Sequence, residues 1–187
     1  MLTRTFSGAL TLAAALLLSA PTQAQKPIEL TALDYIQIQQ LVAKYARAID
    51  TCSNNGYDYA DLYTPDGVFL PIVNGKPAPG IQGRDKLAEV SGGGSKACKN
   101  VPWIDQGVHH IYVNHIITPT PEGATGTVDM MMIGLGGDPN KIENDGYYED
   151  VYVKTAQGWR FKQRTHHAVL DAGQRPPAAG AAPNGKR

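Results

Sequence analysis

Three of the five histidines of the chain, His109, His110 and His115, lie within seven consecutive residues. Histidine has an ordinary pKa close to neutral pH, so it can both accept and donate a proton there. Apolar neighbours such as Ile111 and Val113 indicate a buried β-strand. A buried imidazole either has a structural role, for example donating to a backbone carbonyl, or transfers protons. Three imidazoles on one strand favour a proton-transfer pocket if a carboxylate lies nearby.

Alternation along this strand leaves open which histidine would serve such a pocket. Successive side chains of a strand point to opposite faces, so His110 shares a face with Asn114, and His109 shares the other with His115. The face of His109 is the more apolar one and would be the core face on pattern alone. A bulge or a one-residue slip of register would exchange the two faces. A partner outside the strand is therefore needed to decide.

The first 24 residues have the pattern of a secretory signal. Arg4 precedes an apolar run from Ala9 to Ala20 that is too short to span a bilayer, and small residues follow as far as Ala24. We expect cleavage after Ala24, with an uncleaved anchor as the alternative. The mature protein is then periplasmic or secreted and has no membrane segment.

The rest of the chain predicts one domain of balanced charge. Residues 25–171 are long enough to bury a core, and residues 172–187, rich in Pro, Gly and Ala, are expected to be disordered. The chain has 17 basic and 17 acidic residues without a basic run, which argues against a nucleic-acid partner. In an exported protein Cys52 and Cys98 predict a disulfide, with two free thiols as the alternative. They lack the spacing of a metal site.

The order of the predicted elements, helices first and antiparallel strands afterwards, indicates an α+β fold with helices on one face of a curved sheet. Thr31 and Asp34 form a capping box, and an apolar stripe after it predicts a helix over residues 32–50. Such a sheet, closed at one end by helices, would leave an apolar cavity for a small molecule. Short helices are predicted at 57–63 and 84–90, with a strand at 68–70 and a loop at 74–83 between them. A flexible Gly/Ser segment is predicted at 91–95. Four strands follow, at 108–118, 124–135, 145–154 and 158–170.

Four motifs in sequence order carry a resemblance to a known family: Tyr45 to Asp50, Tyr59 to Phe69, His110 with Asn114, and Gly158 to Arg164. Over about residues 30–170 the chain resembles the SnoaL-like branch of the nuclear-transport-factor-like superfamily. The resemblance implies a cone-shaped α+β barrel, a homodimer through the convex face of the sheet, and no metal or organic cofactor. Similar proteins include polyketide cyclases, scytalone-type and bile-acid dehydratases and ketosteroid isomerases, so the fold alone does not define an activity.

The resemblance also suggests three catalytic residues. Its dehydratase-like members carry a tyrosine and an aspartate at the end of the first helix and a histidine on the following long strand, which correspond to Tyr45, Asp50 and His110. On an ideal helix Tyr45 and Asp50 point about 140° apart. They share a pocket only if the helix loosens near residue 50 or the pocket covers its end. A carboxylate at a helix C-terminus opposes the helix dipole, which favours a functional Asp50 over a solvated one.

Five further residues are candidates for substrate binding: Tyr63, Asn114, Asp129, Arg164 and His167. Tyr63 is either a phenol of the pocket or a core residue with a satisfied hydroxyl. Asp129 interrupts an apolar strand and either points outward or is paired inside the cavity. If Trp159 packs inward, alternation brings His167 into the cavity and turns Arg164 away, unless a bulge intervenes.

These residues predict a cofactor-independent lyase of the dehydratase type for a hydrophobic aromatic, steroid-like or polyketide-like molecule. In this hypothesis His110, oriented by Asp50, moves the proton, and Tyr45 hydrogen-bonds the developing oxyanion. An isomerase or a C–C lyase would use the same residues. A non-catalytic carrier of a hydrophobic ligand would need the cavity without the proton-transfer pair. A contact between Asp50 and a strand histidine, both opening on the cavity, would distinguish an enzyme from a carrier.

Overall fold

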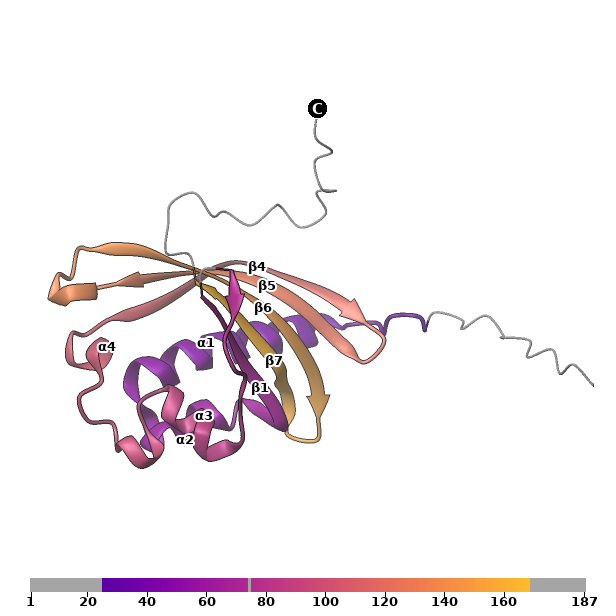
Figure 1. Ribbon diagram of the computed structural model, residues 1–187. Coiled ribbons are helices and arrows are strands. Elements are labelled where there is room, and N and C mark those ends of the chain that lie inside the picture. Colours follow the sequence, from indigo (N-terminus) through magenta and orange to yellow (C-terminus); the bar gives the residue numbers. More distant parts are fainter. Residues whose placement is uncertain (1–24, 74, 169–187) are drawn as a thin grey trace, which may run out of the picture.

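A computed structural model describes residues 25–73 and 75–168 of the chain. The predicted signal peptide (1–24) and the predicted tail (172–187) lie outside these described residues, so both stay predictions. Figure 1 shows two layers, with the helices under the concave side of one curved sheet. The predicted α+β class is therefore confirmed. None of the described helices is long and apolar enough to cross a membrane.

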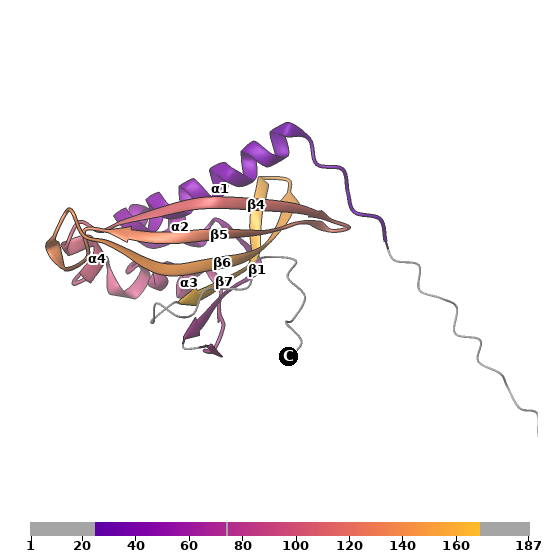
Figure 2. The ribbon, with the colours of Figure 1, turned by 90° about the horizontal axis from the view of Figure 1, so that it is seen from above.

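The long helix α1 (Ala32–Thr51) matches the predicted bounds to within one residue. At its N-terminus the predicted capping box is present. The Thr31 hydroxyl accepts a bond from the Asp34 amide, and the Asp34 carboxylate accepts one from the Thr31 amide at 3.0 Å. Directly after α1, Cys52 has a left-handed φ of 48°, which ends the helix. Seen from above, α1 runs alongside the edge of the sheet (Figure 2).

The other helices are short: α2 (Tyr57–Ala60), α3 (Arg84–Val90) and α4 (Pro102–Asp105), with 3-10 turns at Ser53–Gly56, Gly94–Lys96 and Leu135–Gly137. The helix α3 has the predicted bounds. The helix α2 is shorter than the predicted 57–63 because the chain enters a strand at Tyr63. The helix α4 is not predicted, since four residues are too few to show helical periodicity.

One sheet contains all the described strands: β1 (Tyr63–Val73), β2 (Lys76–Pro77), β3 (Ile81–Gln82), β4 (His109–Thr120), β5 (Gly123–Ile133), β6 (Ile142–Thr155) and β7 (Gly158–Ala168). Their order is β2-β1-β7-β6-β5-β4, with β3 also on β1, and only β1 and β7 are parallel. The four late strands are confirmed with shifts of a few residues. The predicted strand 68–70 is the middle of a longer β1, and the predicted loop 74–83 contains β2 and β3.

Of the register shifts in the sheet, the β-bulges in β4 and β7 change which predicted site residues face the helices. In β4 the pairing with β5 shifts between Val113 and Ile116, and Asn114 in the bulge has a φ of 55°. In β7 the pairing with β6 skips Lys162. Each bulge inserts one residue, so every side chain beyond it moves to the other face of the sheet. Strict alternation therefore predicts the inner face correctly only as far as each bulge.

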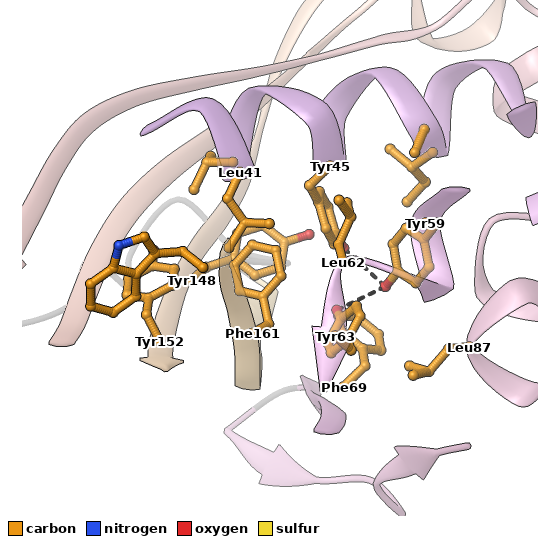
Figure 3. Packing of buried hydrophobic residues seen from close by; sticks show 14 of the residues in the cluster. Leu41, Tyr45, Tyr59, Leu62, Tyr63, Phe69, Leu87, Tyr148, Tyr152 and Phe161 are labelled. Atoms are coloured by element: carbon orange, nitrogen blue, oxygen red, sulfur yellow. Dashed lines mark hydrogen bonds between the residues drawn. The ribbon is translucent and has the colours of Figure 1, made fainter. Parts of the chain in front are cut away.

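Aromatic rings fill the space between α1 and the sheet (Figure 3). Tyr45 and Phe161 are fully buried with their ring centroids 5.8 Å apart. The hydroxyl of Tyr59 donates to that of Tyr45 at 3.3 Å and is hydrogen-bonded to that of Tyr63 at 3.1 Å. Burial of each large apolar side chain contributes about 1.5–3 kcal/mol, so this cluster is a main source of the fold's stability.

The Gly/Ser segment 91–95, predicted to be flexible, is instead packed against the turn after α1. Ser91 is fully buried and its hydroxyl donates to the carbonyl of Ala88 at 3.0 Å. A Cβ atom at Gly93 would lie 2.0 Å from the carbonyl oxygen of Asn55, so this glycine is required by a close backbone approach. The flexible prediction was wrong because glycine also permits tight packing. The predicted disulfide between Cys52 and the nearby Cys98 is present, with 6.0 Å between their Cα atoms.

Candidate functional site

Asp50 and His110 meet where the C-terminal end of α1 lies against the first residues of β4. Nδ1 of His110 donates to Oδ1 of Asp50 at 2.5 Å, and the backbone N–H of His110 lies 3.2 and 3.1 Å from the two carboxylate oxygens. Both side chains are only 8% exposed. These contacts fix the carboxylate and the ring together. With Nδ1 committed to Asp50, Nε2 is the ring nitrogen that can exchange a proton with a ligand.

The surrounding elements explain why Asp50 can occupy the unfavourable end of the helix dipole. Two hydrogen bonds, from the backbone amide and the ring of His110, compensate the carboxylate there. The last turn of α1 is held by the indole of Trp103, which donates to the carbonyl of Ile49 at 3.1 Å. His109 lies farther away, with Nδ1 at 3.8 Å from the carboxylate and a side chain that is 62% exposed. Of the two adjacent histidines, His110 is thus the buried partner of Asp50.

Tyr45 lies in the core and not directly against this pair. Its ring centroid is 5.9 Å from that of Tyr112, which follows His110 by two residues on the same side of β4. The geometry of the helix separates Tyr45 from Asp50 by about 140°. Burial raises the pKa of Tyr45, while the charge of Arg164 opposes that shift. Tyr45 is therefore a protonated phenol at neutral pH and a potential hydrogen-bond donor.

Arg164 and Asp150 form a fully buried pair beside Tyr45. Nε of Arg164 is 3.5 Å from Oδ1 of Asp150, and its guanidinium carbon lies 3.9 Å from the ring centroids of both Tyr45 and Tyr148. No nitrogen of this guanidinium has a hydrogen-bond partner among the described residues. Buried polar groups are normally satisfied, so these donors indicate a place for a ligand or a water molecule. The β7 bulge is what brings Arg164 inward.

The same bulge overturns the predicted place of His167. This ring is on the outer face of the sheet, where it stacks on Tyr147 at 4.4 Å and contacts the carboxylate of Glu149 at 2.8 Å. The prediction that His167 enters the cavity together with Trp159 was wrong, because Lys162 interrupts the alternation between them. The inner face, where alternation placed His167, instead carries His166, which stacks on Tyr148.

Of the three other predicted binding residues, Asn114 is in the lining of an open groove between α1 and β4, and Tyr63 and Asp129 are outside that lining. Tyr63 is a core residue whose hydroxyl is bonded to that of Tyr59, which is the structural alternative. Asp129 points outward and accepts a bond from the amide of Asn114 at 2.9 Å. Asn114 was predicted to share a face with His110, but the β4 bulge exposes it at the rim of an open groove.

Sequence reasoning missed a chain of polar groups that leads to Arg164. Nε2 of His115 is 3.0 Å from the hydroxyl of Tyr152, and this hydroxyl donates to Oδ2 of Asp150 at 2.7 Å. Burial lowers the pKa of His115 to about 4, and burial raises the pKa of Asp150 to about 6. A signal was present: Asp150 shares the period of two with Tyr148 and Tyr152, so it belongs to an otherwise aromatic inner face.

An open groove between α1 and β4 borders both inner histidines of the strand. Its volume is about 470 Å³, and its lining includes Val42 and Ala46 of α1 with His110 and His115 of β4. Apolar walls with a few polar groups are typical of small-molecule sites. Among the residues that the structure describes, no cluster of His, Cys, Asp and Glu could hold a metal ion.

A family model described as a SnoaL-like domain matches residues 31–165. The chain belongs to this family. A curated protein sequence similar to this SnoaL-like domain was not found.

Several solved structures share the fold of this SnoaL-like domain. One is a protein of unknown function from Mycobacterium tuberculosis, with 25% identity over 73% of this chain and 72% of that chain and a TM-score of 0.59. Another is an NTF2-like protein with a cystatin-like fold from Novosphingobium aromaticivorans, with 20% identity, coverages of 79% and 86%, and a TM-score of 0.57. A candidate scytalone dehydratase from the same organism has 21% identity, coverages of 83% and 95%, and a TM-score of 0.55. These similarities show that the chain shares the cystatin-like fold of the NTF2-like protein.

Proposed function

We propose that this SnoaL-like domain is a cofactor-independent lyase with dehydratase-type acid/base chemistry, and that its substrate is a hydrophobic aromatic, steroid-like or polyketide-like molecule. The observation that carries the proposal is the buried 2.5 Å contact between His110 and Asp50. A carrier of a hydrophobic ligand has no use for an oriented histidine–carboxylate pair. Such a pair is the usual device for moving a proton at neutral pH.

In the proposed reaction His110 is first the base and then the acid. Its Nε2 removes a proton from the carbon next to a carbonyl group, while Asp50 accepts the Nδ1–H bond and stabilises the imidazolium. The electron pair of the broken C–H bond forms a C=C bond as the C–O bond to the leaving hydroxyl breaks. His110 returns the proton to that hydroxyl, so one water molecule leaves and the imidazole is restored.

The negative charge that develops on the carbonyl oxygen would be met by Tyr45. The Tyr45 oxygen accepts a bond from Tyr59, and in the proposed reaction the Tyr45 O–H donates to the ligand. The Arg164 guanidinium, 3.9 Å from the Tyr45 ring centroid, adds positive charge beside this phenol. Its unpartnered N–H groups would bind an oxygen of the substrate.

The same residues would support an isomerase or a C–C lyase, and the products distinguish these reactions.

We also propose that the protein is exported and forms a dimer. The disulfide fits an oxidising compartment such as the periplasm or the cell exterior. The outer face of the sheet exposes Ile116 and Val151, which suits a homodimer through that face.

The test is turnover of β-hydroxy ketones built on naphthalene, anthracene and steroid skeletons, with loss of water followed by mass spectrometry. We expect His110→Ala to abolish turnover while the melting temperature changes by only a few degrees, and Asp50→Asn to reduce turnover strongly. His167→Ala is the matched control on the outer face and should retain turnover. Turnover that survives in His110→Ala would contradict the role assigned to His110, and binding without turnover across the panel would favour a carrier.

A further inference from the structure

A second groove lies on the flank of α1 that faces away from β4. It is formed by α1, α2 and the hairpin that joins β6 to β7, and its volume is about 640 Å³. The α1 residues that line it include Lys44 and Arg47, whereas Val42 and Ala46 line the groove beside His110. On a helix these two sets point to opposite sides of the buried stripe. The two grooves are therefore separate sites, and we call this one the α1–hairpin groove.

The α1–hairpin groove contains three cations, of which Lys44 and Arg47 have no carboxylate partner and Arg160 acts on the carboxylate of Asp61 only through its charge, without a close contact. Lys44, Arg47 and Arg160 line it, and none of them forms an ion pair with another described residue. Two carboxylates also line the groove. Asp61 is already held by Arg84 through two bonds of 2.6 and 2.8 Å. Asp58 remains as the one lining carboxylate without a cation, so positive charge is in excess.

The floor of the groove is apolar and rigid. Leu41, Leu62 and Trp159 are core residues whose edges line it. The indole of Trp159 donates to the carboxylate of Asp34 at 3.0 Å, and this carboxylate also caps α1. Nη1 of Arg160 donates to the carbonyl of Trp159 at 2.9 Å, which ties one of the cations to the floor. A site that is already ordered loses less entropy when a ligand binds.

We propose that the α1–hairpin groove is a second binding site, separate from the Asp50–His110 site, for an organic anion with a flat apolar body. The carboxylate or sulfonate group of such a ligand contacts Lys44, Arg47 and Arg160, and its rings lie on the apolar floor. The chain as a whole has a net charge of zero. Attraction to an anion at this groove is therefore local and not a consequence of overall charge.

Two fluorescent probes that differ by one sulfonate group test this site. They are 8-anilinonaphthalene-1-sulfonate and its uncharged analogue N-phenyl-1-naphthylamine, titrated into the full-length protein. Because an exposed charge contributes a few tenths to 1 kcal/mol, the double variant K44E/R47E should bind the sulfonate about tenfold more weakly. Its affinity for the uncharged analogue should be unchanged. Asp58→Asn removes the repelling carboxylate and should bind the sulfonate about two- to threefold more tightly.

The control is the double variant K86E/K99E, which makes the same change in net charge at exposed lysines outside the groove. It should bind the sulfonate as the wild type does. The chain has two tryptophans, so its indole N–H signals in an NMR spectrum report the position of the probe. We expect the sulfonate to shift the signal of Trp159 and not that of Trp103, which lies at the other end of α1 beside Ile49. An equal loss in both double variants, no loss in K44E/R47E, or a shift confined to Trp103 would overturn the proposal.

Discussion

The two inner histidines of β4 differ in what lies behind each ring. His110 has a carboxylate directly against Nδ1, whereas His115 contacts the hydroxyl of Tyr152, which is bonded in turn to Asp150. Because burial lowers the pKa of His115 to about 4, its ring is neutral at neutral pH. The ordinary value for histidine is 6.5. The fold therefore holds His115 as a neutral polar group, and protonation of this ring opposes folding.

This difference predicts how stability changes with pH. Between about pH 6.5 and 4 the unfolded chain binds a proton at His115 and the folded chain does not, so the free energy of unfolding falls as the pH falls. Asp150 has the opposite effect on the free energy of unfolding. Burial raises its pKa to about 6, so as the pH falls the folded chain binds a proton at Asp150 before the unfolded chain does. His115→Asn removes only the first effect. Relative to the wild type, this variant should gain stability as the pH falls from 7 to about 4.5, measured by urea unfolding.

Thr118→Asn is the control for this comparison, because Thr118 is exposed on the same strand and its side chain does not titrate. Its stability difference from the wild type should be the same at both pH values. A His115→Asn variant that keeps the acid sensitivity of the wild type would contradict the assignment of that sensitivity to burial of His115.

At the scale of the elements, the sequence predicts where the strands lie along the chain but not which of their side chains point to the inner face of the sheet. The apolar and turn patterns predict the late strands to within a few residues. Neither Asn114 nor Lys162 carries a signal for a bulge, because a bulge depends on pairing with a neighbouring strand. The sequence placed Asp50 near His110 through a family resemblance, whereas the inward position of Arg164 depended on a bulge that no local pattern reveals.

The disulfide supports the element that carries Asp50. Cys52 follows Asp50 by two residues and joins the packed segment after α3 through Cys98. The double variant C52A/C98A should lower the free energy of unfolding by about 2–4 kcal/mol, because the unfolded chain loses a covalent constraint. Once a substrate is known, turnover should fall as well, since the end of α1 is less firmly held. Denaturant unfolding and steady-state rates measure the two effects.

Each single variant, Cys52→Ala and Cys98→Ala, breaks the same bond and should reproduce the double variant in stability. Wild-type protein kept in a reductant is a further comparison without any change of sequence. An unchanged midpoint of unfolding in the double variant would mean that the packed segment, and not the bond, holds the end of α1.

The whole molecule brings together residues that are far apart in the chain. The Asp50–His110 contact joins residues 60 positions apart, and the pair of Asp150 and Arg164 comes from the two central strands of the sheet, β6 and β7. Composition and element order predict the two layers, because both follow from local patterns. The contents of the interior could not be predicted in the same way, since they depend on how the curved sheet closes over α1. The outer face of the sheet, in contrast, exposes the apolar side chains of Ile116 and Val151.

We expect the protein to form a homodimer through this outer face. Ile116 is 56% and Val151 is 36% exposed there, and burying them would add apolar contact area. The double variant I116E/V151E should be monomeric in analytical ultracentrifugation at concentrations where the wild type is a dimer. Ile36 on α1 is 54% exposed and serves as the control, so Ile36→Glu should stay dimeric. A monomeric wild type would refute the proposed dimer.

The two bulges have a consequence for how such chains can diverge. An added residue in the middle of a strand resembles an insertion in a reading frame. Every later side chain of the strand points to the other face of the sheet, until a second inserted or deleted residue restores the original alternation. Loss of Asn114 would send His115 to the outer face and leave His110 in place, and loss of Lys162 would expel Arg164. Relatives that lack one bulge are therefore expected to carry their inner polar groups one position earlier or later. When chains of this family are aligned, strand residues should be matched first by the face of the sheet to which they point and only then by residue type.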